Sequence, residues 1–426
     1  MKPFYITTTL PYINSSPHIG FAAEIIKADV LARYHRLLGE EVFFNTGTDE
    51  HGLKIYRRSQ EEGVDVQTYC DNLATTFKEL KELLNISYDN FIRTTDAHHL
   101  SSAQKFWEIC QQNGDIYKKT YSVKYCVGCE LEKTDSDLDH GRCPLHPDKD
   151  LEIIEEENYF FRFSKYQDEL LALYDQNPGF VYPPHRLKEI RNFVASGLQD
   201  FSISRLKDKM PWGVPVPGDD TQVMYVWFDA LTNYISSLGW PEEKQNFDKY
   251  WPGLQVCGKD NLRQQTAMWQ AMLLSAKLPN SLGVLIFGFI NSNGQKMSKS
   301  LGNVVEPKNL VEKYGTDALR YYLLREIPTF EDGDFTEDKF KALYNSDLAN
   351  GLGNLISRTT NLIEKNNLSL KLVNESDSKF SEEIKKALEI YDIGNALKII
   401  WEKVKASDEY LSLKTPWKMQ DQTEIK

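Results

Sequence analysis

Four side chains that can bind a metal ion lie within a short segment of the sequence. Cys126 and Cys129 belong to "CVGC", and Cys143 and His146 belong to "CPLH". Two closely spaced ligand pairs separated by a longer stretch are typical of tetrahedral zinc sites. Because four protein ligands leave no open coordination position, the pattern predicts one structural zinc ion per chain. The alternative is that these residues are scattered in loops and bind no metal.

A second candidate site lies in the segment "GQKMSKSLGN". Lys296 and Lys299 lie beside the hydroxyl groups of Ser298 and Ser300, and they follow the apolar stretch "LIFGFIN". Paired ammonium groups on a loop suit a polyanion whose charge rises in the transition state. Taken alone, the same residues also fit a solvated surface loop.

The segment "SPHIGFAAEI" combines a proline, a histidine and a glycine at a predicted strand-to-helix junction. A helix N-terminus presents unpaired N–H groups and the positive end of the helix dipole, which favour a phosphate. Phe21, directly after Gly20, cannot donate a hydrogen bond to such a ligand.

Apolar and helical patterns alternate around these residues and predict an α/β protein. Residues 3–10 and 41–47 look like largely apolar strands, and residues 22–39 between them carry apolar side chains at helical spacing. Strand, helix and strand form a βαβ unit. The sequence therefore predicts a doubly wound parallel sheet, a Rossmann-type core, with ligands at the carboxyl ends of its strands.

Changes in composition divide the chain into segments. The predicted segments are the first half of the core at 1–114, an insertion with the cysteine cluster at 115–216, the second half of the core with the lysine loop at 217–335, and a helical region at 336–426.

The composition excludes several classes of protein. A net charge of −12 over 426 residues argues against a protein that coats nucleic acid indiscriminately. No apolar run is long enough to span a membrane, and the N-terminal segment lacks a signal-peptide pattern, so a cytoplasmic location is expected. The cysteines are too few for a disulfide scaffold. The three outside the cluster, Cys70, Cys110 and Cys257, are expected in the core.

Together, the motifs resemble those of class I aminoacyl-tRNA synthetases, and within that class the methionyl-tRNA synthetase family with one zinc knuckle. The matching segments are, in chain order, "TLPYINSSPHIG", "NTGTDEHGLKI", "YCVGCE", "RCPLH", "DFSISR", "VWFDALTNY", "GKD", "KMSKSLGN" and "TPW". They run from residue 9 to residue 417, so the resemblance covers nearly the whole chain.

The resemblance implies a two-step reaction on a core split by the zinc insertion and followed by a helical anticodon-binding region. L-Methionine and ATP, with Mg²⁺, would give methionyl-adenylate and pyrophosphate, and the methionyl group would then move to initiator and elongator methionine tRNAs. In-line attack on the α-phosphate requires positioned reactants and stabilisation of the leaving pyrophosphate.

The resemblance also implies site residues. Those for ATP are His18, Gly20, Phe21, Asp260, Lys296, Ser298 and Lys299, among which His18, Lys296 and Lys299 are the catalytic ones. Those for methionine are Leu10, Tyr12, Asp49, Trp227, Ala230, Leu231 and Tyr234. Asp49 would pair with the α-ammonium group, and the aromatic and apolar side chains would enclose the thioether. Trp417 would stack on an anticodon base or, alternatively, close a small helical core.

The sequence departs from the family pattern in three places. Phe21 replaces a histidine or asparagine that donates to the phosphates, a loss that typically costs on the order of 10²–10³ in rate unless another group compensates. Gln264 and Gln265 replace an aromatic residue and a histidine near the methionine pocket. The chain ends soon after Trp417, which suggests a shortened anticodon region and a monomer, and "SDLANGLGNLISR" aligns only loosely with the segment that assists anticodon reading.

Two other functions stay open at this point. A catalytically silent relative that binds tRNA or another RNA would explain Phe21. A class I synthetase for leucine, isoleucine or valine would share the core, but those enzymes usually carry a larger editing insertion.

Overall fold

The structure is a computed structural model that describes residues 1–133, 137–297, 302–368 and 381–419. It separates into two compact units: the first contains Met1–Pro17 and His35–Phe287, and the second contains His18–Tyr34 and Gly288–Lys426.

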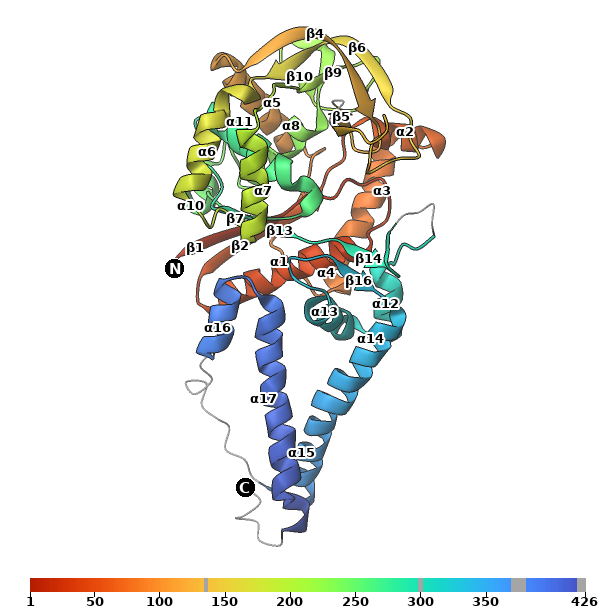
Figure 1. The fold of residues 1–426 in the computed structure, drawn as a ribbon, viewed down its shortest axis with the longest axis vertical. Helices are drawn as coiled ribbons and strands as arrows, with labels where there is room; N and C mark the ends of the chain where they lie inside the picture. The colour runs from red at the N-terminus through yellow and green to blue at the C-terminus, as the bar shows by residue number, and fades with distance from the viewer. Residues whose placement is uncertain (134–136, 298–301, 369–380, 420–426) are drawn as a thin grey trace. The chain divides into compact units, whose positions relative to one another are not determined.

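The first unit contains a parallel sheet (Figure 1). Among the described residues it has six strands, in the order β3-β2-β1-β12-β13-β7. These strands are β1 (Pro3–Thr8), β2 (Glu41–Thr48), β3 (Asn90–Arg93), β7 (Val181–Tyr182), β12 (Leu254–Gly258) and β13 (Gly283–Phe287). All five pairings are parallel, which confirms the predicted fold class.

The strand order reverses at β1, because β2 pairs with one edge of β1 and β12 pairs with the other. In open parallel sheets, ligands bind beyond the carboxyl ends of the strands at such a switch point. The residues that follow β1, β2 and β12 therefore lie where a ligand site is expected.

Apolar side chains on both faces explain why these segments form a buried parallel sheet. Every residue of β13 is buried, and so is every residue of β1 after Pro3. Large aromatic side chains fill the surrounding core, with Trp107 and Trp269 fully buried. Cys70, Cys110 and Cys257 are buried as predicted.

Helices of the first unit connect and cover the strands. They are α2 (Leu53–Glu61), α3 (Val66–Lys78), α4 (Leu80–Leu83), α5 (Ala97–Gln112), α6 (Gln167–Gln176), α7 (Pro184–Ala195), α8 (Val226–Ala230), α9 (Asn233–Ser236), α10 (Lys244–Tyr250), a π-helix at Gln264–Met268 and α11 (Trp269–Ser275).

Two antiparallel sheets separate the two halves of the parallel sheet along the chain. One has the order β5-β4-β6-β8 and contains β4 (Ile116–Cys126), β5 (Leu131–Lys133), β6 (Glu152–Phe161) and β8 (Phe201–Ser202). The other contains β9 (Ser204–Leu206), β10 (Pro215–Val216) and β11 (Asp219–Met224). The short strand β7 comes from the segment expected to form the insertion, yet it pairs with β13 in the parallel sheet.

The second unit begins with most of α1 (Ile19–Leu37), which starts three residues earlier than the apolar pattern predicted. The start is earlier because the carbonyl group of His18 already accepts from the N–H group of Ala22. A small sheet follows, made of β14 (Ile290–Ser292), β15 (Gln295–Lys296) and β16 (Gly333–Phe335).

Helices form most of the rest of the second unit, which confirms the predicted helical C-terminal region. They are α12 (Pro307–Tyr314), α13 (Thr316–Arg325), α14 (Glu337–Leu343), a π-helix at Tyr344–Gly353, α15 (Asn354–Lys365), α16 (Glu382–Glu389), α17 (Ile393–Lys414) and a 3-10 turn at Pro416–Lys418. Within the described ranges, no helix is long and apolar enough to cross a membrane.

Candidate active site and metal centre

The predicted metal ligands come together from two places: Cys126 and Cys129 from the hairpin between β4 and β5, and Cys143 and His146 from the segment between β5 and β6. The Sγ atoms of Cys129 and Cys143 are 3.4 Å apart, and Nδ1 of His146 lies 3.2 to 4.0 Å from the three sulfur atoms. Zinc bonds of about 2.3 Å to sulfur and about 2.0 Å to nitrogen imply ligand separations of roughly 3.5 to 3.8 Å in a tetrahedron. These four donors therefore fit a tetrahedral zinc ion, and they form a cluster able to hold a metal.

Gly128 lets the histidine approach this cluster. A Cβ atom at that position would lie 2.5 Å from Cγ of the His146 imidazole ring. Only glycine therefore fits at position 128 with the imidazole in place.

The loop after β2 carries three consecutive ionisable residues, Asp49, Glu50 and His51, in different environments. The guanidinium group of Arg93 donates to both carboxylate oxygens of Glu50, at 2.7 and 2.8 Å. The hydroxyl groups of Thr48 and Thr95 also donate to this carboxylate. Glu50 is therefore a fully satisfied buried anchor for the loop.

His51 anchors the same loop to α8. Its Nδ1 lies 2.6 Å from the carboxylate of Asp229, and Nε2 of His99 lies 2.9 Å from the other oxygen of that carboxylate. Nδ1 of His99 contacts the hydroxyl group of Ser236 at 2.8 Å. Burial opposes ionisation of Asp229, but its contacts with the two histidines hold its pKa below the usual range.

Asp49, by contrast, presents an unsatisfied carboxylate. It is buried, and its Oδ1 atom finds no hydrogen-bond partner in the described parts of the chain. Burial raises the pKa of the Asp49 carboxyl well above its usual range, and the charge of Asp229 raises it further. Such a group is suited to receive a cationic ligand, because an ammonium group would satisfy both its charge and its hydrogen bonds.

The segment after β1 runs beside Asp49. Tyr12 forms an isolated parallel bridge with Asp49, and the N–H group of Ile13 donates to the carbonyl group of Asp49 at 3.1 Å. Leu10 is buried in the same segment. The structure thus brings Tyr12 and Asp49, two of the residues expected to bind methionine, into direct backbone contact.

Helix α8 and the turn after it contribute the other residues expected to bind methionine. Ala230, Leu231 and Tyr234 are buried, whereas Trp227 is half-buried and its Nε1 atom has no hydrogen-bond partner within the described ranges. Trp227 and Ala230 share α8 with Asp229, which anchors the Asp49 loop, whereas Leu231 is the C-cap of α8 and Tyr234 lies in α9.

Gln264 and Gln265, the second departure from the family pattern, are both buried in the π-helix that precedes α11. Nε2 of Gln265 donates to the hydroxyl group of Tyr234, and Oε1 of Gln265 accepts from Gln255 at 2.9 Å. Because its oxygen is already an acceptor, the amide of Gln265 has a fixed orientation toward Tyr234.

The expected ATP residues divide between the two units. His18, Gly20, Phe21 and Lys296 belong to the second unit, whereas Asp260 is an exposed residue just after β12 in the first. Ser298 and Lys299 lie outside the described residues.

His18 precedes the first turn of α1 and has a defined tautomer. Its Nδ1 accepts from the N–H group of Gly20 at 3.0 Å, and burial lowers the pKa of its imidazole. A neutral ring that accepts through Nδ1 carries its proton on Nε2, so Nε2 is available as a donor. A Cβ at Gly20 would lie 2.7 Å from Cε1 of His18, so glycine is required for this arrangement.

The other described residues of this group differ in exposure. Phe21 is half-buried in the first turn of α1, and Lys296 is exposed at the end of β15. The Nζ atom of Lys296 lies 5.9 Å from the ring centre of Phe289, so its ammonium group is held over an aromatic face.

The helical region places an arginine beside Trp417 that the sequence did not indicate. The guanidinium carbon of Arg358 lies 4.9 Å from the centre of the Trp417 ring, which is 52% exposed. Arg358 also donates to Asp408 at 2.5 Å. It belongs to the "SDLANGLGNLISR" segment, and only the meeting of α15 with the end of α17 reveals its position.

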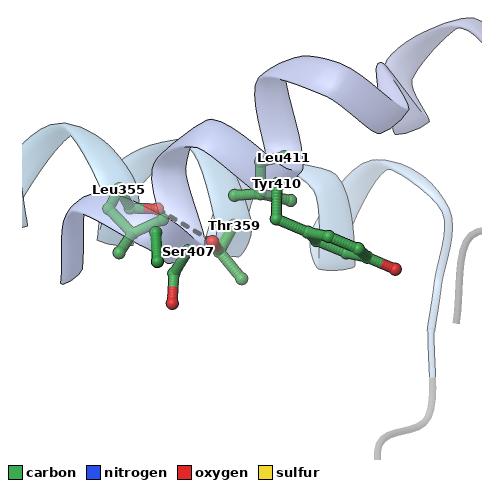
Figure 2. A pocket seen from close by; sticks show the side chains of 6 residues that line it. Leu355, Thr359, Ser407, Tyr410 and Leu411 are labelled. Carbon is green, nitrogen blue, oxygen red and sulfur yellow. Dashed lines mark hydrogen bonds between the residues drawn. The ribbon is translucent and has the colours of Figure 1, made fainter. Parts of the chain in front are cut away.

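A shallow pocket lies between α15 and α17 (Figure 2). It is lined by Leu355, Thr359, Ala406, Ser407, Tyr410 and Leu411. The hydroxyl group of Thr359 donates to the carbonyl group of Leu355 within α15, so its hydrogen is not available to a ligand in the pocket. The pocket has no group suited to chemistry.

The parallel sheet with its switch point matches the fold of class I aminoacyl-tRNA synthetases. Residues 4–152 and 137–360 match the family described as "tRNA synthetases class I (M)". The structure of Mycobacterium tuberculosis methionyl-tRNA synthetase in complex with methionyl-adenylate superposes with a TM-score of 0.93 and 38% identity, covering 100% of this chain and 87% of that one.

Curated relatives agree with this class. The methionine–tRNA ligase of Nostoc sp. (strain PCC 7120) is 43% identical over 99% of this chain and 82% of its own length. The methionine–tRNA ligase of Synechocystis sp. (strain PCC 6803) is 44% identical over 98% of this chain and 81% of its own length. The chain belongs to the methionine–tRNA ligase family.

Proposed function

We infer that this chain activates L-methionine with ATP to methionyl-adenylate and transfers the methionyl group to tRNA(Met). The observation that carries this inference is the similarity to methionine–tRNA ligases over nearly the whole chain, at 43% identity with the Nostoc enzyme. The similarity in fold to a synthetase structure that contains methionyl-adenylate supports the first step.

Methionine binding is assigned to the residues around the Asp49 loop. The unpartnered Oδ1 of Asp49 would accept from the α-ammonium group of methionine. Tyr12 and Trp227, together with Leu10, Ala230, Leu231 and Tyr234, would enclose the side chain, because aromatic and apolar surfaces suit a polarizable thioether.

Nucleotide binding is assigned to the start of α1 and to the lysine loop. Nε2 of His18 would donate to the phosphates at the helix N-terminus. Lys296 and Lys299 would neutralise the leaving pyrophosphate, with Ser298 and Asp260 as further contacts and with Mg²⁺ bound to the nucleotide. Gly20 and Phe21 would lie against the nucleotide without contributing a side-chain donor.

The metal centre is assigned to one structural zinc ion. Cys126, Cys129, Cys143 and His146 supply four ligands, so the ion would hold the hairpin and leave no position for a substrate. Initiator and elongator tRNA(Met) are the proposed tRNA partners, with Trp417 as an anticodon contact. We further propose that the protein acts as a monomer in the cytoplasm.

Methionine-dependent ATP–pyrophosphate exchange tests this function, because it reports adenylate formation without tRNA. We expect exchange with methionine and none with leucine, isoleucine or valine at the same concentration. Exchange with one of those amino acids would identify a synthetase of different specificity. Absence of exchange with any amino acid, in a folded sample that contains zinc, would favour a silent RNA-binding relative.

A further inference from the structure

Glu130 is a buried carboxylate in an unfavourable backbone conformation. It directly follows Cys129, its φ angle is 52°, and its residue surface is only 4% exposed. A positive φ is uncommon for a residue other than glycine or asparagine, and a buried carboxylate is unfavourable unless its oxygens are hydrogen-bonded. Strong interactions must therefore hold Glu130 in this position.

Both carboxylate oxygens of Glu130 accept hydrogen bonds. The hydroxyl group of Tyr12 donates to Oε1 at 3.2 Å, and the backbone N–H group of Lys54 donates to the same oxygen at 2.9 Å. The hydroxyl group of Tyr125 donates to Oε2 at 2.5 Å. None of these three partners is a proposed metal ligand.

The two hydrogen bonds to Oε1 hold two segments next to Asp49: the one that pairs with it and the one that follows it in sequence. Tyr12 pairs with Asp49 through the backbone. Lys54 lies in the first turn of α2, where the N-cap residue Gly52 offers no side-chain cap. Glu130 thus satisfies an N–H group at the start of α2 that would otherwise lack a partner.

Close packing around Gly52 fixes the phenol group of Tyr12. A Cβ atom at Gly52, whose φ is 117°, would lie 2.6 Å from the hydroxyl oxygen of Tyr12 and 3.7 Å from Oε1 of Glu130. The hydroxyl group is therefore enclosed between the start of α2 and the carboxylate, and its ring has one defined orientation.

We propose that Glu130 is a positioning residue for methionine binding. Its carboxylate orients the ring of Tyr12 and the start of α2, and through these two contacts it sets the place of Asp49. The segment that carries the four proposed metal ligands thereby contributes to substrate affinity through Glu130, which is not one of those ligands. This proposal rests on the methionine-activating function inferred above.

The test compares Glu130→Gln with the unmodified protein in ATP–pyrophosphate exchange. The substitution removes the charge and replaces one acceptor oxygen with an NH₂ group that cannot accept a hydrogen bond. We expect the KM for methionine to rise about tenfold, as loss of a charge-assisted hydrogen bond predicts, with kcat changed much less. The KM for ATP and the zinc content measured by elemental analysis should stay unchanged.

Two further variants make the test specific. Glu157→Gln changes an exposed carboxylate of β6 in the same insertion and should match the unmodified protein. Tyr12→Phe removes only the hydroxyl partner of Glu130 and should also raise the KM for methionine. The double variant Tyr12→Phe/Glu130→Gln should be no worse than about the more severe single variant, because the two changes remove one shared interaction.

Three results would overturn the proposal: an unchanged KM for methionine in Glu130→Gln, a loss of zinc from that variant, or fully additive effects in the double variant. If Glu130→Gln does not fold, the Tyr12→Phe variant provides the test. An unchanged KM for methionine in Tyr12→Phe would contradict the proposed link between Glu130 and the methionine site, and a raised KM would support it. Exchange by the unmodified protein is measured in the same series, so failure of the overall function is distinguished from failure of this proposal.

Discussion

At the residue scale, Asp49 differs from its two neighbours in sequence because one of its carboxylate oxygens, Oδ1, has no hydrogen-bond partner among the described residues. Glu50 is held by Arg93, and His51 is held by Asp229. Burial and the charge of Asp229 both raise the pKa of the Asp49 carboxyl. Without a bound ligand, the Asp49 carboxyl therefore keeps its proton at pH values where an ordinary aspartate has lost it.

Methionine binding should consequently release a proton from Asp49. Because the protonated form must ionise to pair with the ammonium group, affinity should rise as the pH increases through the raised pKa. Isothermal titration calorimetry in buffers of different ionisation enthalpy measures the proton release. The same raised pKa makes the folded state hold a proton that the unfolded chain loses, so Asp49 lowers stability as the pH rises above its usual pKa.

Asp49→Asn should abolish this proton release and raise the KM for methionine by about 100-fold, as the loss of a buried charge pair predicts. Asp220→Asn, which changes an exposed aspartate, serves as the control. Equal proton release by Asp49→Asn and the unmodified protein would assign the proton to another group.

Phe21 stands where a hydrogen-bond donor to the phosphates is expected. It lies in the first turn of α1, near His18, and it has no hydrogen-bond donor. Phe21→His should raise kcat for ATP–pyrophosphate exchange by at least about tenfold, since one correctly placed donor is worth 10²–10³ in comparable sites. Phe21→Leu, which is also apolar, should not. A Phe21→His variant with unchanged or lower kcat would mean that another group already supplies this donor.

At the element scale, α8 and the Asp49 loop are joined through one carboxylate. Asp229 accepts from His51 and His99, which lie 178 and 130 positions away in the sequence. Its pKa is held below the usual range against the effect of burial. Its contribution to stability is therefore present above about pH 4 and is lost as the pH falls through the lowered pKa.

Asp229→Asn should lower the free energy of unfolding by about 3 kcal/mol at pH 7, because it leaves two buried histidines without their shared acceptor. Urea denaturation at pH 7 measures the difference, with Asp220→Asn as the matched exposed control. A change of the size seen for the control would show that the two histidines find other partners.

The hairpin between β4 and β5 is the second element with a testable role. Elemental analysis should find about one zinc ion per chain. Cys129→Ser removes one ligand and should lower both the zinc content and the melting temperature, whereas Cys110→Ser, at a buried cysteine outside the cluster, should keep the zinc. A protein that keeps its melting temperature after the zinc is removed would contradict a structural role for the ion.

At the scale of the whole molecule, adenylate formation and tRNA recognition are assigned to different parts of the chain. Trp417 is half-exposed and lies beside Arg358, far along the sequence from the methionine residues. An exposed indole ring can stack on an unpaired base, with a contribution of about 1–3 kcal/mol.

Trp417→Ala should therefore lower kcat/KM for tRNA aminoacylation by about 10- to 100-fold and leave ATP–pyrophosphate exchange unchanged. Leu413→Ala, at another exposed apolar residue near the end of α17, should affect neither assay. Parallel loss of both activities in Trp417→Ala would instead indicate that the indole ring closes a structural core.

Much of the fold was predictable because its signals are local. The strands predicted at 3–10 and 41–47 coincide with β1 and β2, and β13 lies in a continuous apolar run. The four proposed metal ligands form two pairs close in sequence. The two-residue strand β7 is too short to carry a pattern, so only the structure places it in the parallel sheet.

The candidate site was predictable only in part. Motifs indicated Asp49, but not the groups that anchor its loop. Asp229, His99 and Glu130 act through partners distant in sequence, and a buried charge looks like any other acidic or basic residue until its partners are known. Arg358 escaped detection for the same reason.

The loop after β2 also has a consequence for tolerance to insertions and deletions. Its three consecutive ionisable residues have different surroundings, and the place of Asp49 is fixed because Glu50 is bound to Arg93 and His51 is bound to Asp229. A single-residue insertion in this loop would shift the anchoring residues Glu50 and His51 relative to the position of Asp49, whatever residue is inserted. In a library of random one-residue insertions, this loop should therefore be as intolerant as a core strand, unlike most loops that connect strands to helices.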